Sequence, residues 1–375
     1  MNSNLLSAMT VKVFQSIDEI GKDTIDSITH DPFFTYAWFK TLQTQQTYPI
    51  SPIYLAVYDE SKIVGFIPLF MELIDFNSNN TFSKFLKIGH RIGLWQNRLL
   101  KCYSPFSYRS ELLLSDIQNE KLLLNLLAKE IDSICEKQKI LISEFCFVSE
   151  FDKLLNENLQ NYGYQKNSFP NTTTFYLDVQ WSSFEDYLQS LTSKTRKNVK
   201  REIRLCVENG VSIEASEVED LTIKLSKLFT NHALKYDKNA KKFFDPGFFA
   251  TLNMYAKEEI KLFIAKKNSE VVGFSLLLQQ GDILDMFMVG FDYGVQTSSD
   301  FSYFNLCFYA PIKWSIENGV KKIYYRWSME KIKRYRGCKP ENTYRFTKYH
   351  NKLLRALIRN VVKNPLLIKL KSEFK

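Results

Sequence analysis

Two stretches of the chain decide its fold because they repeat one another. Residues 54–70 read YLAVYDESKIVGFIPLF, and residues 262–278 read LFIAKKNSEVVGFSLLL. Each copy has two apolar runs around a polar turn, which predicts a β-hairpin. At an offset of 208, five of 17 positions are identical: Ser61/Ser269, Val64/Val272, Gly65/Gly273, Phe66/Phe274 and Leu69/Leu277. Because the offset is about half of the chain, we expect two similar domains.

A glycine follows two apolar residues in both copies, at Gly65 and Gly273. Glycine inside a strand pattern is typical of a β-bulge or of a close approach by another backbone. We therefore expect one of these two features at the same point of both hairpins.

The sequence around the hairpins predicts helices and further strands in both halves. We expect helices over 31–44, 118–138, 181–210 (one or two), 217–236 and 300–319, and strands over 140–148, 173–179, 211–216, 282–292, 320–328 and 342–350. This order predicts an α/β (α+β) fold with two tandem domains, each a central, mostly antiparallel mixed sheet flanked by helices. The expected domains are residues 1–172 and 173–350, followed by a basic amphipathic C-terminal helix or tail, 351–375.

Composition excludes several classes of protein. With 375 residues, 45% hydrophobic and 15% aromatic, the chain is too apolar to be disordered. No run of 18 apolar residues and no basic-then-apolar leader is present, so neither a membrane span nor a secretory signal is expected. Six isolated cysteines and four histidines favour reduced thiols in a cytoplasmic protein without a metal site.

Positive charge is concentrated at the C-terminal end. Residues 331–375 hold fourteen Lys or Arg and two Glu, a net +12, so the other 330 residues sum to −3 of the total +9. This asymmetry indicates an anionic partner. Within the tail, apolar residues at helical spacing favour either a helix docked on the domain or peripheral attachment to an anionic membrane: Leu353, Leu354, Leu357, Ile358, Val361 and Val362.

Three segments are candidates for chemistry. The helix LTSKTRKNVKREI (191–203) carries a cationic stripe suited to phosphates or another anionic substrate, including Arg196, Lys197 and Lys200. In the stretch 329–346, Lys333, Arg334, Tyr335 and Arg336 come directly before Gly337. This cluster favours an anion-binding site at the end of a strand, and the alternative is a solvated loop. The loop after strand 282–292 offers Ser298 and Ser299 at a helix start, where backbone N–H groups bind pyrophosphate.

The order of these motifs resembles the GNAT-type acyltransferases, in the duplicated branch that includes the Fem peptidyltransferases and the BioF2-like or CelD-like acetyltransferases. The resemblance covers roughly residues 25–350. It is carried by DPFFTYAWFKTL (31–42), by the basic helix 191–203, by the two VGF hairpins and by YYRWSMEKIKRYRGCKP (324–340). Two departures stand out: the branch's Asp-x-Gly is Arg326-Trp327-Ser328, and the Tyr before Lys333 is Ile332.

The resemblance implies a sheet splayed between strands 282–291 and 321–328, into which an acyl-thioester inserts. A strand N–H would polarise the thioester carbonyl. By position, Asp285 or Asp292 is the expected base, and Tyr335 or Tyr303 the acid that protonates the leaving group. Cofactor binding is expected from Ser298, Ser299, Lys333, Arg334 and Arg336.

The expected function is therefore N- or O-acyl transfer from acyl-CoA, with acetyl-CoA foremost, or from acyl-carrier protein. The acceptor would be an amine or hydroxyl, plausibly of a sugar or a cell-surface polysaccharide precursor. One alternative is a Fem-like transferase that uses aminoacyl-tRNA, since basic stripes suit tRNA. The other is a degenerate duplicated domain that binds a partner without catalysis, an alternative that the Arg326-Trp327-Ser328 departure keeps open.

Overall fold

A computed structural model gives the fold. It describes residues 9–45, 51–74, 87–115, 118–167, 170, 172–236, 244–295, 298–351 and 355. The chain forms two compact units. Unit 1 comprises residues 1–19, 50–172 and 342–375, and unit 2 comprises residues 20–49 and 173–341. This division differs from the expected one in two segments, because 20–49 folds with the second unit and 342–350 with the first.

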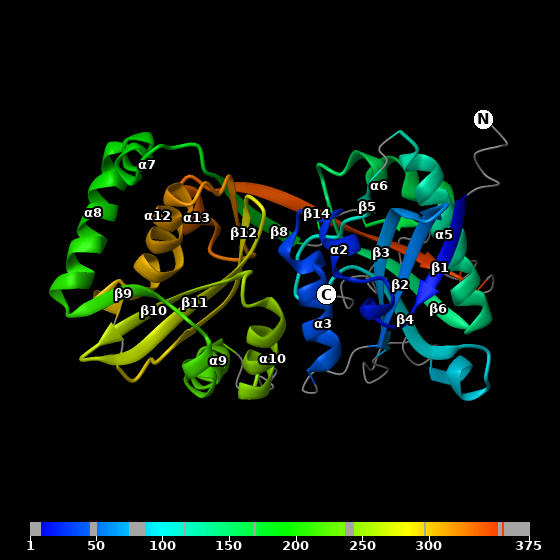
Figure 1. Cartoon of the computed structure of the whole chain (residues 1–375), viewed down its shortest axis with the longest axis horizontal. Coiled ribbons are helices and arrows are strands. Elements are labelled where there is room, and N and C mark those ends of the chain that lie inside the picture. The colour runs from blue at the N-terminus through cyan, green and yellow to red at the C-terminus, as the bar shows by residue number, and fades with distance from the viewer. Residues whose placement is uncertain are drawn as a thin grey trace, which may run out of the picture. The chain divides into compact units, whose positions relative to one another are not determined.

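Unit 1 is a sheet covered by α5 (Figure 1). Its strand order is β1-β2-β3-β4-β6-β14, all neighbours being antiparallel except the parallel β4 and β6. The elements are β1 (Met9–Phe14), η1 (Ile17–Glu19), β2 (Ser51–Asp59), β3 (Lys62–Leu73), β4 (Gln96–Cys102), β5 (Leu113–Leu114), α5 (Glu120–Lys137), β6 (Ile140–Ser149), α6 (Lys153–Asn158), η3 (Leu159–Tyr162), β7 (Gln165–Lys166) and β14 (Lys339–Tyr349). Leu123, Leu127 and Ile131 of α5 are fully buried against the sheet.

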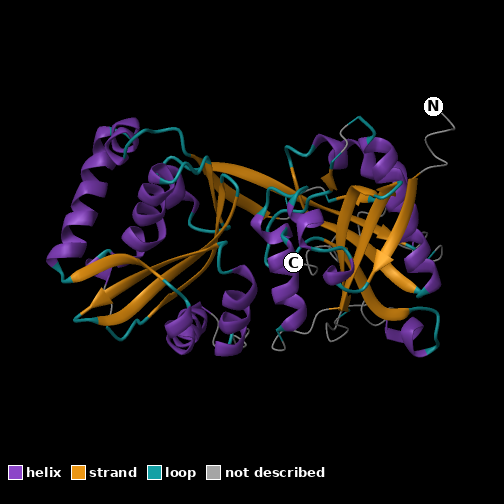
Figure 2. Cartoon of the chain, viewed as in Figure 1, coloured by secondary structure: helices purple, strands orange, loops and turns teal. Residues whose placement is uncertain are grey.

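Unit 2 contains the other six strands of the main hydrogen-bonded order, with helices on both faces (Figure 2). Its strand order is β8-β13-β12-β11-β10-β9, again antiparallel except for the parallel β12 and β13. Its strands are β8 (Thr172–Asp178), β9 (Val211–Ser216), β10 (Ile260–Lys267), β11 (Glu270–Gln280), β12 (Ile283–Phe291) and β13 (Lys322–Tyr325). Its helices are α2 (Lys22–Asp26), η2 (Pro32–Phe34), α3 (Tyr36–Thr44), α7 (Phe184–Ser190), α8 (Ser193–Glu208), η4 (Glu219–Leu221), α9 (Thr222–Tyr236), α10 (Pro246–Ala256), η5 (Ser298–Asp300), α11 (Ser302–Phe304), η6 (Asn305–Tyr309), α12 (Ala310–Glu317) and α13 (Glu330–Tyr335).

The strands of the two units repeat the same pairing pattern, which confirms the predicted fold class. The last strand of each unit's set is exchanged along the chain. β8, which follows β6 and β7, pairs with β13 of unit 2, whereas β14, which follows β13, pairs with β6 of unit 1. A simple division at residue 172 cannot represent this exchange.

The two matched hairpins have the predicted bulge. In unit 1, Val57 faces Gly65 and Tyr58 faces Ile63, so Val64 is the extra residue. In unit 2, Ala265 faces Gly273 and Lys266 faces Val271, so Val272 is the extra residue. The repeated glycine therefore follows the bulged residue in both copies.

Local sequence explains where the helices begin and end. The Asp31 side chain accepts a hydrogen bond from the Phe33 N–H and caps the start of η2. The Thr35 side chain accepts one from the Trp38 N–H and caps the start of α3, which follows directly. Gly210 and Gly319 follow α8 and α12 with φ of 73° and 72°, the left-handed conformation that terminates helices.

Other expectations need correction. The strand expected over 320–328 ends at Tyr325. The stretch 329–346, for which a solvated loop was one expectation, begins with helix α13. The apolar stripe expected in the tail, Leu353 to Val362, lies outside the described residues. No helix in the described part of the chain combines the length and the apolar character that a membrane crossing requires.

Helix α9 packs directly on β12 because Gly290 has no side chain. A Cβ built at Gly290 would lie 2.7 Å from two backbone atoms of α9, the Leu228 carbonyl carbon and the Phe229 nitrogen. It would also lie 2.3 Å from the Phe274 ring. The close contact fixes α9 against the C-terminal part of β12, which borders the candidate site.

We expect Gly290→Ala to lower the melting temperature, because the backbone of α9 cannot move aside without repacking. Overpacking of this kind costs about 2–3 kcal/mol, or roughly 5–10 °C for a unit of this size. Gly65→Ala is the matched control, since its Cβ would meet ordinary contacts at 3.4 Å and beyond. Thermal denaturation followed by circular dichroism measures both, and equal melting temperatures would contradict the packing argument.

Candidate active site

The sheet of unit 2 opens between its two parallel strands. β12 and β13 pair at only three positions, ending at Asp285 opposite Tyr324. β12 continues to Phe291 without β13 beside it. At the point of separation, Arg326 Nε donates to the carbonyl oxygen of Met286 at 2.7 Å, in place of the next backbone pair. The splay implied by the resemblance is therefore present.

A bulge in β12 lies at the opening. Leu276 faces Met288 and Leu277 faces Met286, so Phe287 is the extra residue. Beyond it, the Asp292 N–H donates to Val272 of β11 at 2.8 Å. Because successive N–H groups alternate sides along a strand, those of Phe291 and Val289 point to the side that β13 has left. Backbone donors directed into such a gap can hold a carbonyl oxygen.

Unit 1 has no equivalent opening in its described residues. β4 stays paired with the parallel β6 through Cys102 opposite Phe145, at the last residue of β4. The β3–β4 ladder is regular from Leu69 to Leu73, without a bulge. Only unit 2 therefore has the geometry to admit a thioester or ester between its strands.

Tyr303 spans the mouth of the opening. Its ring contacts Phe291 at the end of β12, with centroids 5.7 Å apart, and its hydroxyl donates to Met329 Sδ at 3.2 Å beyond β13. Burial raises the pKa of Tyr303, so the phenol stays protonated at neutral pH. Strained backbone surrounds it, since Phe301, Ser328 and Met329 have φ of 51°, 75° and 53°. Such strain is concentrated at functional sites.

The two predicted basic motifs meet around one pocket of about 540 Å³. It is lined by Ser190, Leu191, Thr192, Lys194, Thr195, Asn198, Val199 and Glu202 from the α7–α8 region, and by Lys331, Arg334, Tyr335, Arg336 and Gly337 from α13 and its end. We call it the cationic pocket, because four cations and one carboxylate line it, a net +3. The N-terminus of α8, with no acidic residue in its first turn, adds positive potential.

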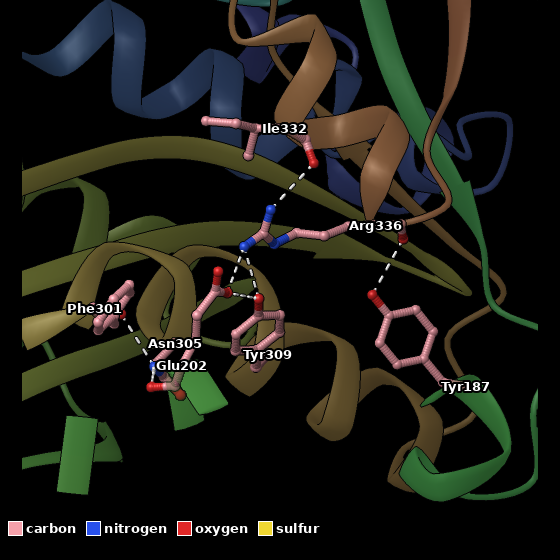
Figure 3. A network of polar contacts seen from close by, with 7 residues as sticks. All are labelled: Tyr187, Glu202, Phe301, Asn305, Tyr309, Ile332 and Arg336. Carbon is pink, nitrogen blue, oxygen red and sulfur yellow. Dashed lines mark hydrogen bonds and ion pairs between the residues drawn. The ribbon is translucent and has the colours of Figure 1, made fainter. Parts of the chain in front are cut away.

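A buried ion pair lies among the residues that line the cationic pocket. Figure 3 shows its contacts. Arg336 Nη2 lies 2.7 Å from both Glu202 Oε2 and the Tyr309 hydroxyl oxygen, and Tyr309 also donates to Glu202. The Asn305 side chain donates to the carbonyl oxygen of Glu202 at 3.1 Å. The Tyr187 hydroxyl donates to the carbonyl oxygen of Arg336 at 3.2 Å. The π-helix η6 carries both Asn305 and Tyr309 toward α8, and π-turns of this kind are frequent at functional sites.

Lys333 and Arg336, both expected to bind the cofactor, are instead mostly engaged inside the protein. Lys333 is 5% exposed, and its ammonium donates to the carbonyl oxygens of Arg326 and, at 3.0 Å, of Trp327. Burial lowers the pKa of Lys333 to about 8. These bonds hold the segment after β13 in place. Arg334 is more accessible, paired with Glu330 at 2.8 Å on the surface.

The expected substrate-binding residues of α8 differ in accessibility. Arg196 Nη1 donates to the carbonyl oxygens of Gln189 and Leu191, both at 3.3 Å, at the end of α7. Lys200 is paired with Glu185 at 3.0 Å. Lys197 is exposed but does not line the cationic pocket, whereas its neighbour Lys194 does.

The remaining predicted residues lie in different parts of unit 2. Asp285 is 5% exposed in the paired part of β12. Asp292 follows β12 and accepts the N–H of Gly294 at 3.0 Å. Tyr335 is 54% exposed on the pocket wall, away from core contacts. Ser299 is exposed and its carbonyl oxygen accepts from Asn209, while the side chain of Ser298 lies outside the description.

Sequence reasoning missed Glu202 and Tyr309, and it interpreted His232 as a structural helix residue without identifying its partner Tyr293. The signal for Glu202 was its position as the one acid in the basic motif 191–203. His232 Nδ1 lies 2.7 Å from the Tyr293 hydroxyl oxygen just beyond β12. Burial and Lys235 lower the pKa of His232 to about 4, so its imidazole is neutral.

Removal of the buried pair should destabilise unit 2 far more than removal of a surface pair. We expect Glu202→Ala to cost about 3–5 kcal/mol, because Arg336 would keep an uncompensated buried charge. Glu330→Ala, which breaks the exposed pair with Arg334, should cost about 0–1 kcal/mol. Urea denaturation compares the two. The double variant Glu202→Ala/Arg336→Met should recover part of the loss, and similar losses for the two single variants would argue against the buried pair.

Comparisons with known proteins agree with this architecture. The profile of the FemAB-like family, described as peptidoglycan biosynthesis/recognition, matches residues 15–366. Similar solved structures include FemX (TM-score 0.63, 12% identity, 92% of this chain and 99% of that one) and a tandem GNAT protein from the clavulanic acid biosynthesis pathway (0.52, 10%, 92% and 99%). A conserved protein of unknown function from Bacteroides thetaiotaomicron is also similar (0.55, 8%, 91% and 99%). A search of curated proteins finds no match.

Proposed function

The chain belongs to the FemAB-like family, and from this premise we propose that it is an acyltransferase whose unit 2 binds an activated acyl donor. The observation that carries the proposal is the parting of β12 from β13 after three paired residues. The opening has a bulged strand on one side, a protonated Tyr303 at its mouth and the cationic pocket in the same unit. These are the parts that transfer from a phosphate-bearing donor requires.

The proposed reaction needs an oxyanion site, an acid and a base. The acceptor nitrogen or oxygen attacks the acyl carbonyl carbon. The N–H groups of β12 donate hydrogen bonds to the carbonyl oxygen as it gains negative charge. The bond to the leaving sulfur or oxygen breaks, and Tyr303 gives that atom a proton. Asp292, at the open end of β12, takes the proton of the acceptor. Asp285 is too buried for this role in our proposal.

Two classes of donor fit the cationic pocket. Acyl-CoA is the first, with acyl-carrier protein as a relative that shares its phosphopantetheine thioester. The second is aminoacyl-tRNA, which the family match favours. Both present an activated acyl carbon attached to a phosphate-bearing group, so the same cations serve either donor. An amine or hydroxyl of a peptidoglycan or other polysaccharide precursor is the proposed acceptor, in keeping with the family's description.

Donor binding should depend on the cations of the pocket wall. We expect Lys194→Ala/Lys331→Ala to weaken binding of the true donor at least tenfold, because charge-assisted contacts to phosphate contribute about 1.5–3 kcal/mol each. The assay is isothermal titration with acetyl-CoA and longer acyl-CoAs, and filter binding with aminoacyl-tRNA at fixed salt. Lys197→Ala, on the same helix but outside the pocket, is the matched control. Absence of binding to every donor would refute the proposal in favour of a non-catalytic role.

The turnover number should distinguish Tyr303 from Tyr335, the two tyrosines that the sequence analysis gave as candidate acids. Tyr303→Phe should lower kcat by about 10²-fold or more, as loss of an acid does, with donor affinity unchanged. Tyr335→Phe should leave kcat nearly intact, because Tyr335 lies exposed on the pocket wall. Single-turnover transfer of a radiolabelled acyl group measures both variants. Equal rates for Tyr303→Phe and the unsubstituted protein would remove Tyr303 from the mechanism.

A further inference from the structure

Four large aliphatic side chains are exposed at one end of unit 1, in and beside the connection from β3 to β4. Leu73 is 76% exposed, Ile88 58%, Ile92 67% and Leu94 49%. Leu73 pairs with Arg98 across the strands. The turn that carries the others is ordered by hydrogen bonds from the Ile92 N–H to Ile88 and from the Leu94 N–H to Gly89. Three of the four lie within residues 88–94, and exposed aliphatic side chains grouped in one short ordered turn are candidates for an interaction surface.

Cations surround these side chains. Residues 87–98 read KIGHRIGLWQNR, with Lys87, Arg91 and Arg98 and no Asp or Glu. All three cations are exposed. The Gln96 N–H donates to the carbonyl oxygen of Lys139, which brings a further exposed cation to the same end of the sheet. The surface is therefore both aliphatic and positively charged.

Strand β14 ends beside this surface. His350 and Asn351, which follow β14, line the same pocket as Leu94 and Lys139. That pocket also contains Lys348, Arg355 and two acids, Asp132 and Glu136, so its charged side chains sum to +1. Residues 351–375 add seven Lys or Arg and one Glu.

We infer that the β3–β4 surface, defined by Leu73, Ile88, Ile92 and Leu94 with Lys87, Arg91 and Arg98, docks on an anionic lipid bilayer. The aliphatic tips enter the boundary between headgroups and acyl chains, and the Lys and Arg side chains remain among the anionic headgroups. Charge complementarity selects this occupant, because a cluster of aliphatic tips within a cationic rim matches an anionic interface. A nucleic acid would use the cations and leave the aliphatic tips in water.

The surface lies in unit 1, and the inference does not depend on the activity proposed for unit 2. Its location would bring the enzyme to acceptors held at a membrane. The attachment is peripheral and reversible, since it relies on a few side chains and on charge.

The test is co-sedimentation of the full-length protein with extruded vesicles of phosphatidylcholine, with or without 30% phosphatidylglycerol. We expect binding to the anionic vesicles only, weakening as salt is raised. Ile88→Ser/Ile92→Ser/Leu94→Ser should reduce the partition coefficient about tenfold or more, because each lost aliphatic contact weakens insertion. Ile223→Ser, which removes a 71% exposed side chain on α9, is the matched control and should bind as the unsubstituted protein does.

Two results would overturn the inference. Equal binding by the triple variant and the unsubstituted protein would assign attachment to the tail alone, since the tail is intact in both. A lower melting temperature of the triple variant would show that another part of the chain covers these side chains. Unchanged melting together with lost binding supports the β3–β4 surface.

Discussion

The short pairing of β12 with β13 is the constraint on which the rest of unit 2 depends. In unit 1, β4 stays paired with the parallel β6 up to its own last residue, Cys102. In unit 2 the ladder stops at Asp285, and three features act together at that point. Arg326 satisfies the next carbonyl, Phe287 bulges from the opposite ladder, and Lys333 holds the departing segment by its carbonyl oxygens. The opening is thus stabilised from both sides.

The same unit shows how a basic sequence is distributed between structure and binding. Arg196 completes the end of α7, Lys200 and Arg204 pair with nearby glutamates, and Arg336 is buried with Glu202. Each of these cations supports a helix or a helix contact. The cations that line the cationic pocket at its surface, Lys194 and Lys331 above all, are a minority of those that the sequence motifs contain. Net charge alone therefore overstates the binding surface.

Local signals were sufficient for much of the fold and insufficient for the site. The hairpins, their bulges and helix α5 follow from alternation, glycine placement and helical periodicity, which act over a few residues. The exchange of β8 and β14 depends on pairing between strands far apart in the sequence, and no local pattern encodes it. The ion pair of Glu202 with Arg336 joins residues 134 positions apart. The sequence motifs identified both segments that line the pocket, but not that 330–335 is helical, nor which side chains face the pocket.

The exchanged strands also govern how the chain can fold during synthesis. Unit 1 needs β14 to complete its sheet, and β14 begins at residue 339 of 375. Ribosomes add about 5–20 residues per second, so the exposed edge of β6 waits on the order of ten seconds or more after β6 itself emerges. During that interval β6 presents an unpaired, largely apolar strand edge, the kind of surface that recruits chaperones or aggregates. An early stop codon would therefore leave the first half of the chain without its closing strand.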